Sequence, residues 1–212
     1  MADTEFPIVP TKTALLFFDT LNVYMHPKDP AKQEALDKLG IMDTLRKANQ
    51  GFREAGLTIF YAQADHRPDH RDVAPLIVGQ GHDENASSGP RVFGRRAAVS
   101  GSWEAEVIPE IAPQAGDYVI KKHRWSTFFQ THFELSLRTA GIDTLLLAGG
   151  STEIGIASTA YAARDLDFHQ VILRDACYSG RPFVNDFLMG HVFPVFTRVM
   201  TVDEALAVVQ RA

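Results

Sequence analysis

Short apolar runs dominate the pattern of hydrophobic and polar positions along this chain. They are hydrophobic throughout rather than at alternate positions, which is typical of strands buried on both faces of a parallel sheet. The strong runs, rich in β-branched or aromatic residues, are Thr13–Asp19, Leu57–Ala62, Thr144–Gly149 and Gln170–Asp175. Weaker strands are predicted at Tyr118–Lys122 and Arg198–Val202.

Segments of helical length separate most of these strands. They cover roughly residues 31–55, 127–140, 154–167, 183–196 and 202–210. Gly56 and Gly141 follow predicted helices, where a left-handed C-cap residue is favoured, and Thr201 to Glu204 has the pattern of a capping box. The alternation predicts a three-layer α/β/α fold, a doubly wound sheet of about six mostly parallel strands with helices on both faces.

Composition narrows the class of protein and of partner. The 212 residues, 45% hydrophobic and 22% charged, suit one globular domain spanning residues 1–212. The net charge of −5, with both signs interspersed, argues against nucleic acid and anionic membranes, since both favour a clustered basic face. No secretory signal or membrane-spanning run is recognisable. We therefore expect a cytoplasmic protein whose partners are small molecules.

Polar residues at the carboxyl ends of predicted strands are the first candidates for chemistry, because ligands of open parallel sheets bind there. Asp19 directly follows the run Ala14–Phe18, and a carboxylate in that setting suits general acid or base catalysis. Capping of the next turn through Asn22 is an equal alternative. Lys121 and Lys122 end another strand and point to opposite faces, so only one can face a site. Spacing does not decide which.

The run that ends at Gly149 continues through Gly150 and Ser151 into a predicted helix. Free N–H groups at the start of that helix offer a site for an anion or oxyanion. A tight turn that needs glycine only for its geometry explains the same residues. The segment lacks the Gly-x-Gly-x-x-Gly and Walker patterns, so it is not a typical nucleotide loop.

Several segments together resemble the isochorismatase-like hydrolases, a family that includes nicotinamidases, carbamoylsarcosine amidohydrolase and isochorismatase. The segment Lys122–Phe128 is similar to the family's Lys-x-Arg-x-Ser-Ala-Phe motif. Each motif alone is weak, but the set is specific, and the resemblance covers nearly the whole chain. The other matching segments are Ala14–Asp19, Gly141–Leu145, Gly149–Ala160 and Arg174–Ala176.

The resemblance implies roles for residues at the strand ends. Asp19 matches the catalytic aspartate, Lys122 rather than Lys121 the catalytic lysine, and Gly155 the position of a nucleophilic cysteine in many members. Glycine cannot form an acyl-enzyme, and true isochorismatases, which also have glycine there, hydrolyse a vinyl ether by protonating carbon. The implied activity is hydrolysis of a small molecule, a carboxylated one among the candidates, with Asp19 as the acid and Lys122 balancing its charge.

The same resemblance places Gln63, Ile154 and Trp125 at the substrate and implies a homo-oligomer. For Gln63, an amide that satisfies a neighbouring backbone group is an equal alternative. The family's Asp-Met-Gln opening reads Asp19-Thr20-Leu21 here, which indicates that the substrate can differ from isochorismate. A non-proline cis peptide bond is expected near Gly150–Ser151, as in many family members.

Metal binding is not expected from the sequence. The segment Asp65–His70 resembles the metal-binding segment of nicotinamidases, but Gln63 falls where their ligand aspartate would be. Zinc needs three convergent ligands, so we expect a solvated loop, no metal and no other cofactor. Cys177, the single cysteine, is expected to be a small buried hydrophobic residue rather than a displaced nucleophile.

Two further functions stay open for this chain. One is a catalytically inactive binding or scaffold homologue. The other is a cysteine amidohydrolase whose nucleophile has been replaced at position 155.

Overall fold

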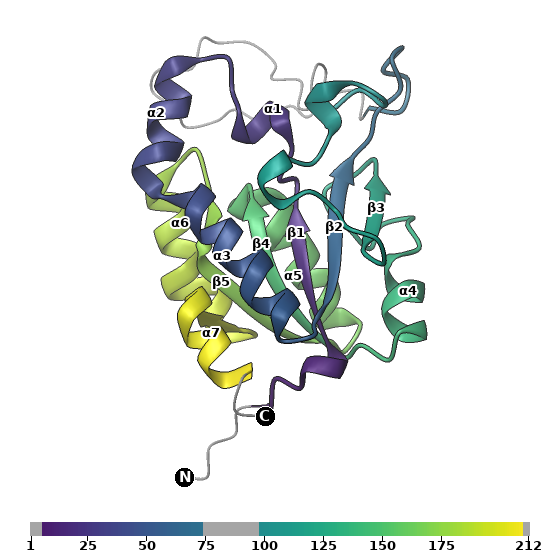
Figure 1. Cartoon of the computed structure of the whole chain (residues 1–212), viewed down its shortest axis with the longest axis vertical. Coiled ribbons are helices and arrows are strands. Elements are labelled where there is room, and N and C mark those ends of the chain that lie inside the picture. Colours follow the sequence, from purple (N-terminus) through teal and green to yellow (C-terminus); the bar gives the residue numbers. More distant parts are fainter. Residues whose placement is uncertain (1–5, 74–97, 210–212) are drawn as a thin grey trace.

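A computed structural model describes residues 6–73 and 98–209, and a six-stranded sheet forms its centre (Figure 1). Every pairing between neighbouring strands is parallel, and the order is β3-β2-β1-β4-β5-β6. This confirms the predicted doubly wound α/β fold. The strands are β1 (Thr13–Phe18), β2 (Thr58–Ala64), β3 (Tyr118–Lys122), β4 (Thr144–Gly150), β5 (His169–Tyr178) and β6 (Arg198–Met200).

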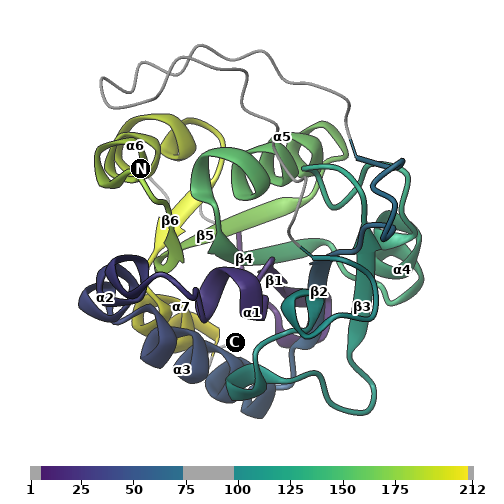
Figure 2. The same ribbon diagram turned by 90° about the horizontal axis from the view of Figure 1, so that it is seen from above.

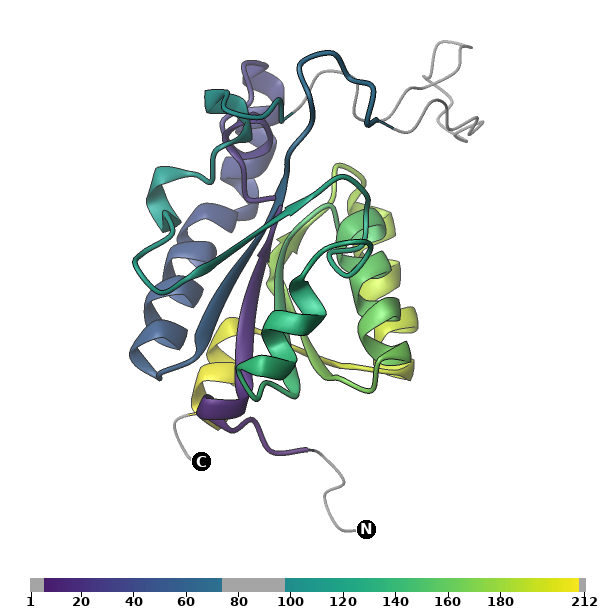
Figure 3. The same ribbon diagram turned by 90° about the vertical axis from the view of Figure 1, so that its right-hand side faces the viewer.

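Helices cover both faces of the sheet (Figure 3). One face packs against α3 (Ile41–Glu54) and α7 (Val202–Val209), and the other against α4 (Phe133–Thr139) and α5 (Ala157–Asp165). Three further helices are α1 (Asn22–Met25), α2 (Pro30–Leu39) and α6 (Pro182–Phe187). No helix among the described residues is long and apolar enough to cross a membrane.

The apolar runs form strands because both of their faces are buried. In β1, Leu15 and Phe17 join the core beneath α3 and α7, while Ala14, Leu16 and Phe18 join the core beneath α4 and α5. Successive side chains of a strand point to opposite faces, so a strand between two helical layers is apolar over most of its length. The first polar side chain after β1 is therefore placed at the carboxyl edge of the sheet.

Several predicted helices differ from the observed ones, and each difference begins at a particular backbone feature. The predicted helix over residues 31–55 is two helices, because Gly40 has a left-handed φ of 61° between α2 and α3. The segment over 127–140 becomes helical only at Phe133, after Gln130 with a φ of 53°. Residues 183–196 pass from α6 through a π-helical turn into a 3₁₀ turn, and a π-helical turn also precedes α5.

The local signals at helix ends agree better with the structure. Gly56 and Gly141 have φ values of 84° and 71°, as their C-cap positions require. In the predicted capping box, the Glu204 N–H donates to Thr201 Oγ1 at 3.1 Å and the Thr201 N–H donates to Glu204 Oε2 at 2.7 Å. The peptide bond Gly150–Ser151 is cis, as expected.

The strand order fixes where a ligand can bind. The chain leaves β1 toward β2 and β3 on one side and returns to β4, β5 and β6 on the other, so the connections diverge between β1 and β4. In doubly wound sheets, ligands bind at such a point, beyond the carboxyl ends of the strands. Figure 2 looks onto this edge of the sheet.

Candidate active site

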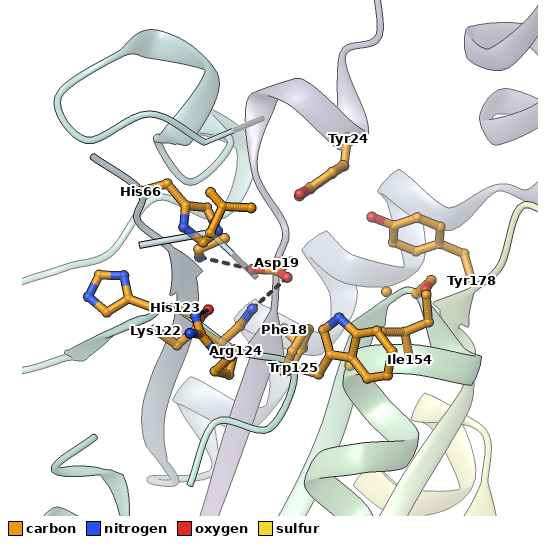
Figure 4. Close-up of a pocket in the computed structure, with 15 residues that line it drawn as sticks. Phe18, Asp19, Tyr24, His66, Lys122, His123, Arg124, Trp125, Ile154 and Tyr178 are labelled. Atoms are coloured by element: carbon orange, nitrogen blue, oxygen red, sulfur yellow. Dashed lines mark hydrogen bonds and ion pairs between the residues drawn. The ribbon is translucent and has the colours of Figure 1, made fainter. Parts of the chain in front are cut away.

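A pocket of about 320 Å³ lies at the carboxyl edge of the sheet (Figure 4). Residues just after β1, β2 and β3 meet there with the turn after β4 and the end of β5. Among the residues that line it are Asp19, His66, Lys122, Trp125, Gly155 and Tyr178.

Asp19 is the first residue after β1, and the backbone at this point fixes its position. Its backbone N–H donates to the Ala62 carbonyl at 2.9 Å, and its φ of 46° then turns the chain away from the sheet. Aspartate tolerates this left-handed region better than most residues. The carboxylate accepts the Ala64 N–H at 3.0 Å through Oδ1 and Lys122 Nζ at 2.8 Å through Oδ2. The side chain is therefore held by two donors from neighbouring strands.

Lys122 reaches Asp19 because of the pairing between β2 and β3. Ala64 lies opposite Lys122, and Gln63 lies opposite Lys121, so the two lysines point to different faces. Lys122 is 3% exposed, and its Nζ lies 4.3 Å from the centroid of the Phe18 ring. Lys121 instead donates to Asp65 at 3.3 Å. The structure thus brings Lys122, and not Lys121, to Asp19.

Two tyrosines that the sequence analysis did not select complete this side of the pocket. The hydroxyls of Tyr24, from α1, and Tyr178, at the end of β5, point toward the space beside Asp19 (Figure 4). Burial, with the negative charge of Asp19 adding to it, raises the pKa of both phenols far above the usual range. Both hydroxyls therefore stay protonated and can donate hydrogen bonds. Tyr24 lies in a four-residue helix without periodicity, so no sequence signal marks it.

Gly155 is packed against Phe18. A Cβ built on Gly155 would collide with the Phe18 ring, and one on Gly150 would lie 2.5 Å from the Tyr178 ring. The absence of a side chain at Gly155 therefore leaves no room that substrate or water could fill, because the Phe18 ring occupies it.

The turn after β4 also differs from an open oxyanion site. The backbone N–H groups of Ile154, Gly155 and Ile156 all donate to the Ser151 carbonyl, at 3.2, 3.0 and 3.3 Å. Of the two explanations that the sequence left open for this turn, the internal acceptor favours a tight turn over an anion site at these three N–H groups.

The remaining candidates from the sequence divide into two groups. Ile154 and Trp125 line the pocket, and their contact with a substrate stays a prediction. Gln63 does not join the described lining residues, because alternation along β2 turns it to the face of Lys121, where its amide donates to the Ala105 carbonyl. Cys177 is buried in β5 and burial raises the pKa of its thiol, which fits a hydrophobic residue rather than a nucleophile.

A second group of titratable side chains borders the same pocket. His66 and His123 line it, and Nδ1 of each lies close to Oδ2 of Asp72, at 3.4 and 3.3 Å. The ligand atoms of the three residues all lie within 4.8 Å of one another. Among the described residues, this is the one set of His, Cys, Asp or Glu side chains whose spacing could hold a metal ion.

Comparison with known proteins decides the family. Residues 13–204 match the isochorismatase domain. The chain is 33% identical over 195 residues to the uncharacterized isochorismatase family protein YwoC of Bacillus subtilis, and the match covers 92% of this chain and 93% of that protein. The chain belongs to the isochorismatase family.

Relatives of this isochorismatase-family protein include amidohydrolases. The ureidoacrylate amidohydrolase RutB of Rhizobium rhizogenes is 28% identical over 211 residues, covering 96% of this chain and 85% of that protein. The crystal structure of N-carbamoylsarcosine amidase from Thermoplasma acidophilum is similar with a TM-score of 0.70 and 30% identity, covering 91% of this chain and 97% of that one. This isochorismatase-family protein is therefore a hydrolase.

Proposed function

We propose that this isochorismatase-family hydrolase cleaves a small carboxylated vinyl ether, with Asp19 as the acid and no cysteine nucleophile. One observation carries the proposal. A buried Asp19–Lys122 pair, 2.8 Å between Oδ2 and Nζ, lies in the pocket beside a turn in which Phe18 occupies the space of any side chain at Gly155. The pocket thus offers a proton-transfer group without a nucleophile at that turn.

The reaction needs one proton, which Asp19 gives and regains. Its carboxyl protonates the terminal carbon of the C=C bond, and the ether oxygen stabilises the resulting oxocarbenium ion. Water adds to that cation, and its proton returns to Asp19 as the hemiketal collapses to a carbonyl product and an alcohol. Between the two transfers, Lys122 Nζ and the Ala64 N–H stabilise the carboxylate. No acyl-enzyme is required.

A substrate carboxylate has suitable partners across the pocket. The protonated hydroxyls of Tyr24 and Tyr178 face the space beside Asp19, and Arg124 also lines the pocket. Trp125 and Ile154 supply an apolar wall near Gly155. We assign these residues to substrate binding, and we leave Gln63 out because its amide is committed to the Ala105 carbonyl.

The two competing functions are less well supported by this pocket. A cysteine at position 155 would collide with the Phe18 ring, so replacement of an original nucleophile requires that Phe18 moved as well. An inactive binding protein has no need for a buried lysine and aspartate, since burying two charges is costly even when they are paired. Two relatives are amide hydrolases, and we do not transfer that activity to this chain.

Hydrolysis in heavy water tests the proposal directly. Isochorismate, other carboxylated vinyl ethers and small amides would be screened with the purified protein, and products analysed by NMR. Carbon protonation by Asp19 places deuterium on the carbon that was the terminal alkene carbon. Vinyl ether cleavage with that label supports the proposal. Amide hydrolysis alone, or ether cleavage without carbon-bound deuterium, contradicts it.

A further inference from the structure

We propose that the exposed face of the helical segment 182–195 binds a second copy of this chain about a two-fold axis. The segment comprises α6, the π-helical turn Leu188–Val192 and the 3₁₀ turn Phe193–Val195. It lies on the same side of the sheet as α5, at the periphery of the molecule (Figure 2). Its exposed residues recur at four-residue spacing and are called the α6 stripe: Pro182, Phe183, Asp186, Phe187, Gly190, His191, Pro194 and Val195.

The α6 stripe exposes large apolar side chains. Phe183, Phe187 and Val195 are 79%, 49% and 81% exposed. The ring centroids of Phe183 and Phe187 lie 6.4 Å apart, and those of Phe187 and His191 lie 5.3 Å apart. The three rings therefore form a continuous ridge, and contiguous apolar patches of this kind mark interaction sites.

The opposite face of the same segment is apolar as well. Met189 and Phe193 are buried in the core that also contains the inner side of α5. Asp186 and His191 are the two ionisable side chains within residues 182–197. A helix that is hydrophobic all round is normally buried all round. A single chain buries one face of this helix, so the α6 stripe requires a further partner.

The order of residues along the α6 stripe is complementary to itself. A two-fold axis between positions 188 and 189 makes two copies of the helix antiparallel, and each contact then occurs twice. Asp186 of one copy faces the partner's His191, which pairs the two ionisable side chains of the stripe. Phe187 faces the partner's Gly190. No described atom outside its own helix backbone lies within 4 Å of a Cβ built on Gly190, so this ring has an open space to fill.

The contact can extend beyond the α6 stripe onto α5. Stable dimers usually bury about 800 Å² of surface on each partner, which is more than one face of a short helix supplies. Tyr161 of α5 is half exposed and stacks on Phe196, with 4.9 Å between the ring centroids. These two rings continue the apolar surface next to Val195 and add to the area that a second copy can cover.

Other occupants match the α6 stripe less well. Anionic lipid surfaces attract helices that carry Lys or Arg beside the apolar face, and the stripe contains neither. The adjacent Arg181 is already paired with Glu153 at 3.3 Å. An unrelated protein would not require the stripe to match its own reversed order. The pairing of Asp186 with His191 under a two-fold axis therefore favours a second copy.

A partner on the α6 stripe would also support the pocket from outside. On the inner side of α6, the Oδ1 atom of Asn185 accepts a hydrogen bond from Thr152 Oγ1 at 2.7 Å. Thr152 belongs to the turn that carries Ile154 to the pocket. Association would hold α6 against this turn. The inference does not depend on the reaction assigned to Asp19.

Sedimentation velocity of the full chain over a range of concentrations provides the first test. We expect the parent to sediment as two chains or a multiple of two. Phe187→Asp should sediment at half the parent's mass, with association weakened on the order of a hundredfold, because an aromatic anchor is replaced by a charge at the axis. Gly190→Phe should do the same, since its ring would take the space of the partner's Phe187. Leu135→Asp is the matched control, because it changes an exposed apolar residue on α4 and should keep the parent's mass.

A charge exchange between two variants provides the second test and does not rely on any single variant. In Asp186→Lys the imidazole faces an ammonium group, and in His191→Asp two carboxylates face each other, so each variant alone should associate on the order of a hundredfold more weakly. An equal mixture of the two should form a mixed dimer, because Lys then faces Asp in one contact and the original pair remains in the other. A monomeric parent, a parent mass retained in Phe187→Asp, or a mixture that associates no better than its components would overturn the proposal.

Discussion

Two aspartate–lysine pairs use adjacent lysines of β3 and differ mainly in the exposure of the lysine. Asp19 and Asp65 have similar side-chain exposures, 13% and 14%. The exposures of their lysine partners differ, because the Lys122 side chain is 4% exposed and the Lys121 side chain is 57% exposed. The buried pair is also closer, at 2.8 Å against 3.3 Å.

The difference shows that alternation along the strand, rather than residue type, decides which lysine is buried in the pocket and which is a surface charge. Lys122 points to the face of Phe18 and the pocket, while Lys121 points into solvent. A lysine in water can leave its carboxylate at little cost, whereas Lys122 and Asp19 have few other partners and little water to replace each other. The same pair of residue types is therefore a buried pair inside the pocket on one face and an exposed ion pair on the other.

The largest expected effect is the difference in kcat/KM between variants of the two aspartates. Asp19→Asn should lower kcat/KM about 10² to 10⁴-fold, the usual contribution of a general acid. Asp65→Asn should change it less than about twofold, because Asp65 lies outside the described pocket lining. Steady-state kinetics on the substrate found in the screen would measure both. Turnover that survives in Asp19→Asn would remove Asp19 from the mechanism.

The next largest expected effect is on the free energy of unfolding, which variants of the two lysines should change to different extents. Lys122→Met should lower the free energy of unfolding by about 3 kcal/mol, because it leaves Asp19 buried without its partner. Lys121→Met should cost less than about 1 kcal/mol, as for other exposed pairs. Urea denaturation followed by circular dichroism would give both values. Equal losses would mean that burial does not distinguish the pairs.

The strands and the carboxyl-edge residues could be predicted because burial on two faces leaves a continuous apolar run. Asp19 stands out as the first polar residue after such a run. The choice between Lys121 and Lys122 could not come from spacing, since a strand end offers both faces. Resemblance selected Lys122, and the β2–β3 register explains why it faces Asp19.

The missed features depend on contacts between distant segments. The Phe18 ring over Gly155 joins residues that are far apart in the chain, and nothing in either segment reports the ring's direction. His66 and His123 meet at Asp72 only because β2 and β3 are neighbours. Gly40 divides a predicted helix because one residue's φ overrides a long helical pattern.

A substitution at Gly155 tests whether the packing around the buried pair leaves space for the side chain of a nucleophile. Gly155→Cys should lower the free energy of unfolding by about 1 to 3 kcal/mol through crowding of Phe18, and should lower native activity. Gly190→Cys is the matched control, because nothing lies within 4 Å of its built Cβ, and it should change stability by less than about 0.5 kcal/mol. Amidase activity in Gly155→Cys, with none of any kind in the parent, would favour a replaced nucleophile.

The smallest expected effect is the influence of salt on the coupling energy between Asp65 and Lys121. A double-mutant cycle with Asp65→Asn and Lys121→Met should give a coupling of about 0.2 to 1 kcal/mol. At 1 M NaCl this coupling should disappear, because the Debye length falls to about 3 Å and Lys121 is open to ions. The cycle with Asp19→Asn and Lys122→Met should keep most of its larger coupling in the same salt, since neither side chain is accessible enough to be screened. A buried coupling that fell in parallel with the exposed one would show that water and ions reach Lys122, and the pocket would then not hold a shielded pair.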